Sequence, residues 1–255
     1  MLLSDRPRVL YQRAPAHEVI CQLRFPTILS INNVEPADFQ DTIRETFPQY
    51  ARRQEVPPAV PGTQAQPVAN YHFLSEDGRW KLNLTKDFIA LSTLRYPGWE
   101  EFAHHLDKPL AAFIQLYKPA YFQRVGLRYV NVFSRTRLGL EGTPWRELFA
   151  PVYTGPLQEE PEDRLQGWGC DMTLQLDSSC RAKVHAGLGR LQVKNAPQQD
   201  QEAKFILDLD LSMGGNLPCT MAAGALETLH IHGGHLFEGA ITDRLREALE
   251  PTAPQ

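Results

Sequence analysis

Two predicted strands carry the side chains that are best suited to bind an anion. Gln22 and Arg24 lie in the run "HEVICQLRFP", and Arg124 and Arg128 lie in "YFQRVGLRYVNVFSR". Side chains two or four positions apart on a strand lie on the same face. The planar guanidinium group of arginine matches carboxylate and phosphate groups. If the two strands are neighbours in a sheet, these four side chains form one ligand-binding face.

The same polar face has a simpler interpretation, and the sequence leaves both open. The face is either solvated or has its arginines paired with carboxylates of the covering helices. Gly126, which lies between the two arginines of the later strand, would let a ligand approach the backbone closely. Because an unpaired buried guanidinium is costly, we expect a carboxylate or an anionic partner beside these arginines.

Three histidines, His230, His232 and His235, fall within the string "LHIHGGHLFEG". Zinc needs ligands that converge on one point. On a helix, positions two apart point about 200° apart, so only His232 and His235 share a face, with Glu238 as the nearest further ligand. We favour a helix with the histidines outside, and we expect no metal. The dry side of this helix then consists of Leu226, Leu229 and Leu236.

Other chemical motifs are weaker. Asp208 and Asp210 share one face of "LDLDLS" and could hold a metal, but such a pair is typical of a solvated strand face. Gly187 and Gly189 continue into a strand, which favours strand glycines over a phosphate-binding loop. There is no GxSxG motif, and Cys21 in a dry strand should have a raised pKa. We therefore predict no catalytic residue and no cofactor.

Composition indicates an ordinary globular protein. The chain has 255 residues, of which 42% are hydrophobic and 22% charged. Up to Arg135 there are 16 Lys and Arg against 13 Asp and Glu, and after it 10 against 17. The acidic second part argues against a strongly basic nucleic-acid-binding domain. The four cysteines include no CxxC pair, and the sequence has neither an apolar run of membrane length nor a signal-peptide core. We therefore expect a cytoplasmic location.

Strands and helices alternate in a pattern that predicts an α+β fold. The first part reads β-α-β-β-β-α-β and the second α-β-β-β-α-α. We predict two antiparallel sheet-plus-helix halves that pack against each other, residues 1–137 and 138–255. The first part comprises a strand at 18–25, a helix at 35–47, strands at 68–76, 77–85 and 88–97 with a turn at Asp77-Gly78, a helix at 99–117 and a strand at 121–135. The second comprises a short helix at 145–149, strands at 167–178, 181–194 and 203–213, and helices at 220–237 and 242–249.

Two segments are predicted to be exposed loops. Residues 52–67 contain four prolines, which remove backbone donors, and a strand should begin near Val68. Residues 158–163 form an acidic loop. Both loops would supply surfaces for contact with a protein partner.

Four stretches, "APAHEVICQLRFPTIL", "FQDTIRETFPQY", "RVGLRYVNVF" and "LHIHGGHLFEGAITDRLREALEP", resemble a sporadically distributed bacterial protein family of about this length. The resemblance covers nearly the whole chain. The family has no assigned activity, so no catalytic residues carry over. Its patchy distribution is similar to that of mobile defence or toxin–antitoxin genes, which implies an accessory role.

These observations favour a non-enzymatic binding protein that acts with an operon partner or a larger complex. One alternative is an RNA-binding or RNA-processing protein that uses Arg24, Arg124 and Arg128. Another is a small-molecule sensor with its ligand on the polar sheet face formed by Gln22 and the arginines. Salt-dependent RNA binding would favour the first alternative, and a co-purifying protein would favour the main interpretation.

Overall fold

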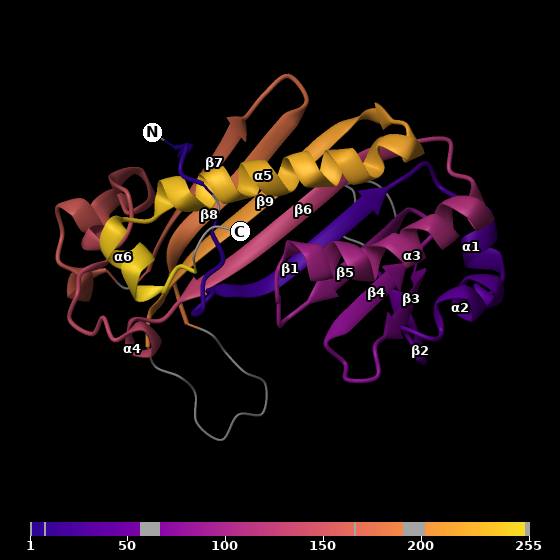
Figure 1. The fold of residues 1–255 in the computed structure, drawn as a ribbon, viewed down its shortest axis with the longest axis horizontal. Helices are drawn as coiled ribbons and strands as arrows, with labels where there is room; N and C mark the ends of the chain where they lie inside the picture. The colour runs from indigo at the N-terminus through magenta and orange to yellow at the C-terminus, as the bar shows by residue number, and fades with distance from the viewer. Residues whose placement is uncertain (1, 8, 57–66, 166, 191–201, 253–255) are drawn as a thin grey trace. The chain divides into compact units, whose positions relative to one another are not determined.

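A computed structural model describes residues 2–7, 9–56, 67–165, 167–190 and 202–252. In these ranges nine strands form one antiparallel sheet in the order β2-β3-β4-β5-β1-β6-β9-β8-β7 (Figure 1). The α+β class is therefore confirmed. The strands are β1 (Ala16–Arg24), β2 (Gln49–Glu55), β3 (Val68–Leu74), β4 (Trp80–Leu84), β5 (Phe88–Thr93), β6 (Phe122–Phe133), β7 (Trp168–Gln175), β8 (Cys180–Gly189) and β9 (Lys204–Leu217).

Helices and short 3-10 turns connect these strands. The helices are α1 (Leu29–Asn33), α2 (Ala37–Ile43), α3 (Trp99–Tyr117), α4 (Arg135–Leu138), α5 (Ala222–Ala240) and α6 (Asp243–Ala248). The 3-10 turns are η1 (Trp145–Glu147), η2 (Pro151–Tyr153), η3 (Gly155–Gln158), η4 (Glu162–Arg164) and η5 (Cys219–Met221). Within the described ranges, no helix combines the length and the apolar character needed to cross a bilayer.

The chain divides into two compact units that do not follow the predicted halves. Unit 1 comprises residues 1–17, 128–211 and 228–255, and unit 2 comprises residues 18–127 and 212–227. The difference from the predicted boundary at residue 137 arises because the long strands β6 and β9 each contribute residues to both units.

In unit 2, the core forms where α2 and α3 pack on the sheet. The ring of Phe113 in α3 lies 4.7 Å from Phe25, and Phe102 lies 5.6 Å from Trp80 in β4. Both α3 residues are fully buried, as their helical spacing predicts. Helix α3 covers the predicted residues and ends at Tyr117. The next residue, Lys118, caps it with φ 46° and precedes Pro119.

In unit 1, α5 packs on β6 and β9. A Cβ on Gly233 would lie 3.2 Å from the ring of Tyr129 in β6, so this glycine lets the helix approach the sheet closely. Phe237 lies 6.2 Å from Phe133, and Phe149 stacks on Phe205 with 3.9 Å between ring centroids. The unit 1 core is therefore built from aromatic rings on one sheet face.

The segment around residue 50 corrects two predictions. Helix α2 is shorter than predicted and ends at Ile43, and residues 49–55 form a strand that pairs with β3, with Arg52 opposite Tyr71. The predicted loop at 52–67 was thus wrong for its first four residues, and residues 57–66 lie outside the described part. Strand β3 begins at Val68, as predicted, and Gly78 has the positive φ of 66° that its hairpin turn requires.

One plan occurs twice in the order of strands. From β1 outward the strands are β5, β4, β3 and β2, whereas from β6 outward they are β9, β8 and β7. Each series is followed in the chain by a helix of 19 residues, α3 or α5. Among the described residues the second series has no counterpart of β2, and the chain between β6 and β7 forms α4 and η1 to η4 instead.

Candidate functional site

Arg128 is paired within the protein. On β6 its Nε and Nη2 atoms donate to the carboxylate of Asp208 in β9 at 2.8 and 2.5 Å. The arginine side chain is 46% exposed, whereas that of Asp208 is only 16% exposed. The expected carboxylate therefore comes from a neighbouring strand and not from a helix. Asp208 is also one of the two aspartates, Asp208 and Asp210, whose spacing could suit a metal site.

The other three residues of the predicted face belong to unit 2. The sheet order places β1 beside β6, as that prediction required. Gln22 is half-buried opposite Ala90, and Arg24 is exposed. Cys21, the residue before Gln22, is buried, and burial raises the pKa of its thiol, as predicted. Arg128 belongs to unit 1, so a shared site of all four residues stays a prediction.

The space beside Gly126 is used by the chain itself. A Cβ on this glycine would lie 2.1 Å from Nη1 of Arg124, so the guanidinium group of Arg124 lies over the glycine backbone. The sequence had suggested that a ligand would use this close approach. In the structure the guanidinium group of Arg124 occupies this space.

A group of buried polar residues in unit 2 was not predicted. Nδ2 of Asn83 in β4 donates to Oδ1 of Asn70 in β3 at 2.9 Å, and His72 lies opposite Asn83. All three are at least 92% buried, although their side chains are polar. Burial, the largest cause, lowers the pKa of His72, which favours a neutral imidazole.

The prediction that the histidines of α5 all lie on its outer side was wrong for one of them. His230 is 4% exposed, and its Nδ1 lies 2.6 Å from the hydroxyl group of Tyr129 in β6. Glu238 is also buried and accepts a hydrogen bond from Tyr11. Because this helix packs against the sheet over a wide surface, two of its polar side chains have partners inside unit 1.

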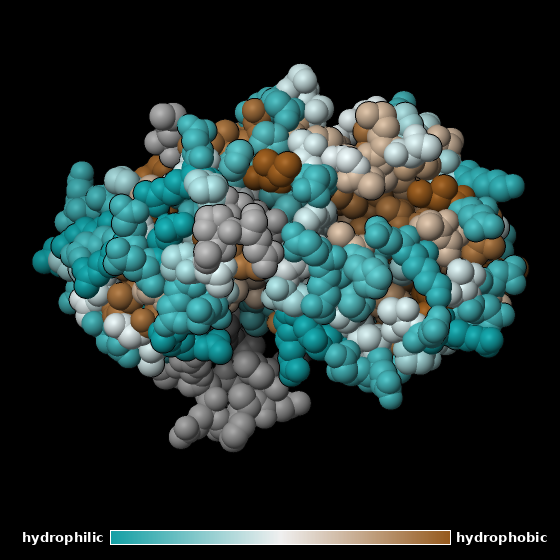
Figure 2. Space-filling model, in the orientation of Figure 1, coloured by the Kyte–Doolittle hydropathy of each residue, from teal (hydrophilic) through white to brown (hydrophobic). Residues whose placement is uncertain are grey.

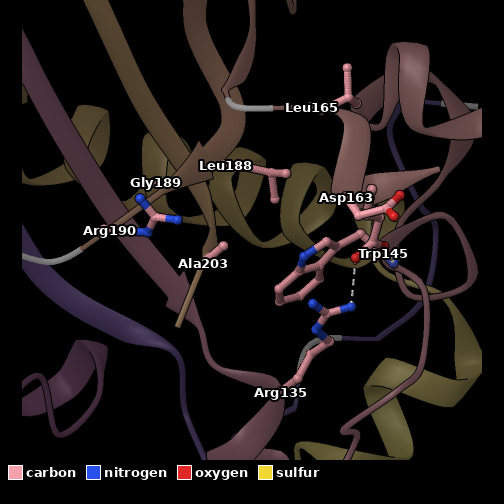
Figure 3. A pocket seen from close by; sticks show the side chains of 9 residues that line it. Arg135, Trp145, Asp163, Leu165, Leu188, Gly189, Arg190 and Ala203 are labelled. Atoms are coloured by element: carbon pink, nitrogen blue, oxygen red, sulfur yellow. Dashed lines mark hydrogen bonds and ion pairs between the residues drawn. The ribbon is translucent and has the colours of Figure 1, made fainter. Parts of the chain in front are cut away.

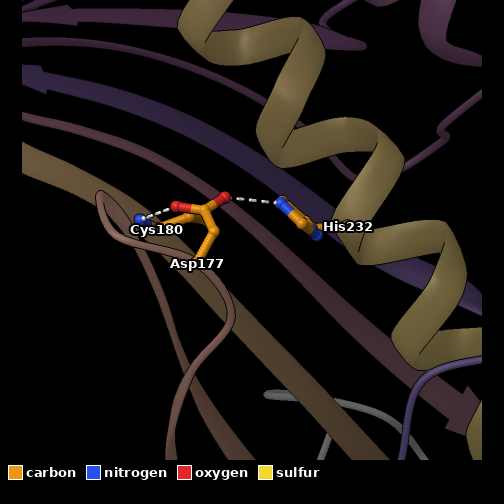
Figure 4. A group of neighbouring side chains, drawn as sticks. All are labelled: Asp177, Cys180 and His232. Carbon is orange, nitrogen blue, oxygen red and sulfur yellow. Dashed lines mark hydrogen bonds and ion pairs between the residues drawn. The ribbon is translucent and has the colours of Figure 1, made fainter.

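Asp177 connects the β7–β8 turn to α5 (Figure 4). Its Oδ1 accepts hydrogen bonds from the backbone N–H groups of Ser179 and Cys180 at 2.7 and 2.8 Å, and its Oδ2 lies 2.9 Å from Nε2 of His232. These backbone donors are the main reason why the pKa of Asp177 lies well below its usual range. The carboxylate thus fixes the turn and its position on the helix.

Asp177, Cys180 and His232 also bring three potential metal-ligand atoms within 4.8 Å of one another. Helical spacing pairs His232 with His235 and gives no indication of this trio. Burial raises the pKa of the Cys180 thiol to about 11, so the sulfur is protonated at neutral pH. Since the carboxylate already has its hydrogen-bond donors, the trio has a structural explanation, and the absence of a metal stays a prediction.

A pocket in unit 1 has a volume of about 740 Å³ (Figure 3). It forms where the start of α4, the turns η1 and η4, the end of β8 and the residue before β9 meet. A volume of this size is typical of small-molecule sites. The lining residues are Arg135, Trp145, Glu162, Asp163, Leu165, Leu188, Gly189, Arg190 and Ala203.

Glu162 organises one side of this pocket. Its Oε1 accepts the backbone N–H of Trp145 at 2.5 Å, and its Oε2 accepts Nη1 of Arg135 at 2.8 Å. The guanidinium group of Arg135 lies 4.6 Å from the centre of the Trp145 ring, a cation–π distance. Both carboxylate oxygens are therefore engaged. The predicted acidic contact loop instead holds the pocket together at this residue.

Several polar groups of the pocket remain available. Arg135 forms hydrogen bonds to described residues through its Nη1 atom alone. Its Nε and Nη2 donors have no partner among those residues. Nε1 of Trp145 is buried and has no partner in the described ranges. Figure 3 shows Arg190 and Asp163 on opposite sides of the pocket, and neither forms an ion pair with a described residue. The two arginines can bind a ligand that has hydrogen-bond acceptors and a negative charge.

No spacing in the sequence could have revealed the pocket. Arg135, Glu162 and Arg190 lie on separate elements and are more than 20 residues apart along the chain. Comparisons with known proteins add no further assignment: no protein-family model matches the chain, and no curated protein matches it either. The chemistry of the pocket therefore carries the functional argument.

Proposed function

We propose that this chain is a non-enzymatic binding protein and that its ligand is a small anionic molecule held in the Arg135 pocket. The observation that carries the proposal is a pocket of about 740 Å³ lined by two arginines, one of which has donors without a partner among the described residues and lies on a buried tryptophan. This proposal keeps the sensor alternative from the sequence but moves its ligand away from the sheet face.

The lining residues define the chemistry of the ligand. Arg190 and the free donors of Arg135 suit one carboxylate or phosphate group. Leu165, Leu188 and Ala203 suit a flat apolar body. Asp163 disfavours a second negative charge on its side of the pocket. The expected ligand is therefore an aromatic or alicyclic molecule with a single anionic group.

A thermal-shift screen tests this proposal on the full chain. The probes are aromatic monocarboxylates and nucleoside monophosphates, each beside an uncharged analogue. A ligand present at 100 times its Kd stabilises the folded state by about 2.7 kcal/mol, which raises the Tm by several degrees. We expect at least one anionic probe to raise the Tm and its uncharged analogue to have no effect.

Two arginine variants show whether a hit occupies this pocket. Arg190→Ala removes an exposed cation of the pocket, and Arg181→Ala removes an exposed cation near the start of β8, outside the pocket lining. The Tm shift should be lost in the first variant and retained in the second. Equal shifts in both variants, or no shift with any anionic probe, would contradict the proposal.

RNA remains a second candidate, supported by the exposed side chain of Arg24. Arg128 already pairs with Asp208, so this alternative rests on Arg24 and Arg124. Fluorescence anisotropy with a labelled single-stranded RNA at two salt concentrations would test it. Salt-dependent binding that Arg24→Ala weakens would support RNA as the ligand.

The same proposal includes an accessory role beside an operon partner, in a mobile defence or toxin–antitoxin context. It also includes a cytoplasmic location. Both parts rest on the sequence. A protein partner would be identified by affinity purification of the tagged chain from its native host. A stoichiometric partner would support this role. Its absence would leave the small-molecule ligand as the sole supported part of the proposal.

A further inference from the structure

The outer edge of β7 ends the sheet in unit 1. On its inner side β7 pairs with β8, with Met172 opposite Val184. The sheet order gives β7 no described strand on its other side, and Figure 1 shows the β7–β8 pair at this end of the order. Every second one of its eight residues therefore presents its backbone N–H and C=O groups at this edge, where they can pair with another strand.

The two edges of the sheet differ in their protection. β2 is polar on both faces and carries Arg52, Arg53 and Glu55, which discourage pairing with another chain. β7 contains neither lysine nor proline, and its single charged residue, Asp171, lies on the outward face beside His185. By this measure β7 is an edge that can accept a strand, whereas β2 is not.

The apolar face of β7 is incompletely covered. Cys170, Met172 and Leu174 are half-buried. Their partners on the same face of β8 are fully buried, namely Ala186, Val184 and Ala182. In the other series of strands the position outside β3 is occupied by β2, and that position is empty next to β7 among the described residues. An added strand would complete the burial of this face.

We propose that a second copy of this chain supplies the added strand, so that β7 pairs antiparallel with β7 of its partner. The two-fold axis of such a dimer is perpendicular to the sheet, so opposite residues must lie on the same face. This inference is independent of the ligand in the Arg135 pocket.

Two pairing registers engage the most residues of β7, namely those with Asp171 or Met172 on the two-fold axis. With Met172 on the axis, Cys170 lies opposite Leu174 of the partner, and Asp171 lies opposite Thr173 of the partner. Apolar residues then meet apolar residues on one face, and polar residues meet on the other. With Asp171 on the axis, two carboxylates would face each other, which is unfavourable. The dimer therefore has Met172 at its centre.

Sedimentation velocity of the full chain over a concentration series tests the dimer. A strand pair of eight residues is a small interface, so we expect a monomer–dimer equilibrium that depends on concentration. Met172→Lys places two ammonium groups opposite each other on the axis and should weaken dimerisation at least tenfold. Gln54→Lys on the edge strand β2 is the matched control and should leave dimerisation unchanged.

Circular dichroism melts of both variants show whether they fold. A chain that stays monomeric at every concentration would overturn the proposal. An equal effect of the two lysine variants, with both folded, would also overturn it.

Disulfide trapping tests the register directly. Residues opposite each other in an antiparallel pair have Cα atoms about 4.5–5.5 Å apart, which a disulfide can span. In a Cys170→Ser background, Met172→Cys should form a covalent dimer under mild oxidation, whereas the Cys170→Ser protein alone should not. Efficient trapping by Asp171→Cys in place of Met172→Cys would contradict the proposed register.

Discussion

At the residue scale, contacts inside the protein engage several of the polar side chains that the sequence singles out. Arg128 pairs with Asp208, Arg124 lies over Gly126, and His232 pairs with Asp177. The alternation of residues along the strands predicts which side chains share a face. It could not predict their partners, because each partner comes from a distant segment brought close by the fold.

Arg128 and Asp208 should behave as one structural pair. Arg128→Ala leaves the mostly buried carboxylate of Asp208 without its fork of donors, and we expect a loss of about 1–2 kcal/mol in the free energy of unfolding. The double variant Arg128→Ala/Asp208→Ala should be no less stable than Arg128→Ala, and urea denaturation measures this. Additive losses would show that the pair is not coupled.

Asp177 should make stability depend on pH. Its pKa is lowered in the folded state, so its contribution is complete above the unfolded value of about 3.9 and is lost as the pH falls through the folded value. Asp177→Asn should lower the Tm by about 2–4 °C at pH 7, and this difference should shrink below about pH 4. Asp171→Asn, whose carboxylate is 86% exposed, is the control and should change little. A Tm difference for Asp177→Asn that is the same at pH 7 and pH 3 would refute the assigned role.

At the element scale, long amphipathic segments were predictable and short polar ones were not. The apolar spacing of Phe102, Leu106 and Phe113 predicted α3 with its observed ends. The strand β2 was missed because "QYARRQE" has no apolar alternation, and its strand conformation depends on pairing with β3. Helix α5 was predicted, but its buried His230 was not, since the sheet contacts more of this helix than its leucines indicate.

Two glycines of α5 should respond to alanine in opposite directions. A Cβ on Gly239 would lie 2.3 Å from the backbone oxygen of Leu2, whereas a Cβ on Gly224 would meet no atom within 4 Å. Gly224→Ala should stabilise the protein by up to about 1 kcal/mol through helix propensity. Gly239→Ala should destabilise it by about 1–3 kcal/mol through overpacking against the backbone. Thermal melts of both variants check this, and a stabilising Gly239→Ala would contradict the close approach of Leu2.

At the scale of the whole molecule, the α+β class followed from the sequence, but the compact units and the pocket did not. Strands β6 and β9 contribute to both units, so no cut at a single residue could have described the division. The Arg135 pocket draws on segments between residues 135 and 203, and its central residue, Glu162, was expected in an exposed loop. Such a pocket depends on long-range packing, which local patterns do not encode.

The central claim is that the Arg135 pocket binds a small monoanionic molecule. Isothermal titration calorimetry of the best anionic probe into the wild type, Arg190→Ala and Arg181→Ala tests it most directly. We predict one site per chain, a Kd at least tenfold weaker for Arg190→Ala, and an unchanged Kd for Arg181→Ala, because only Arg190 lines the pocket. Binding that is equally strong in all three proteins would place the ligand elsewhere and contradict the claim.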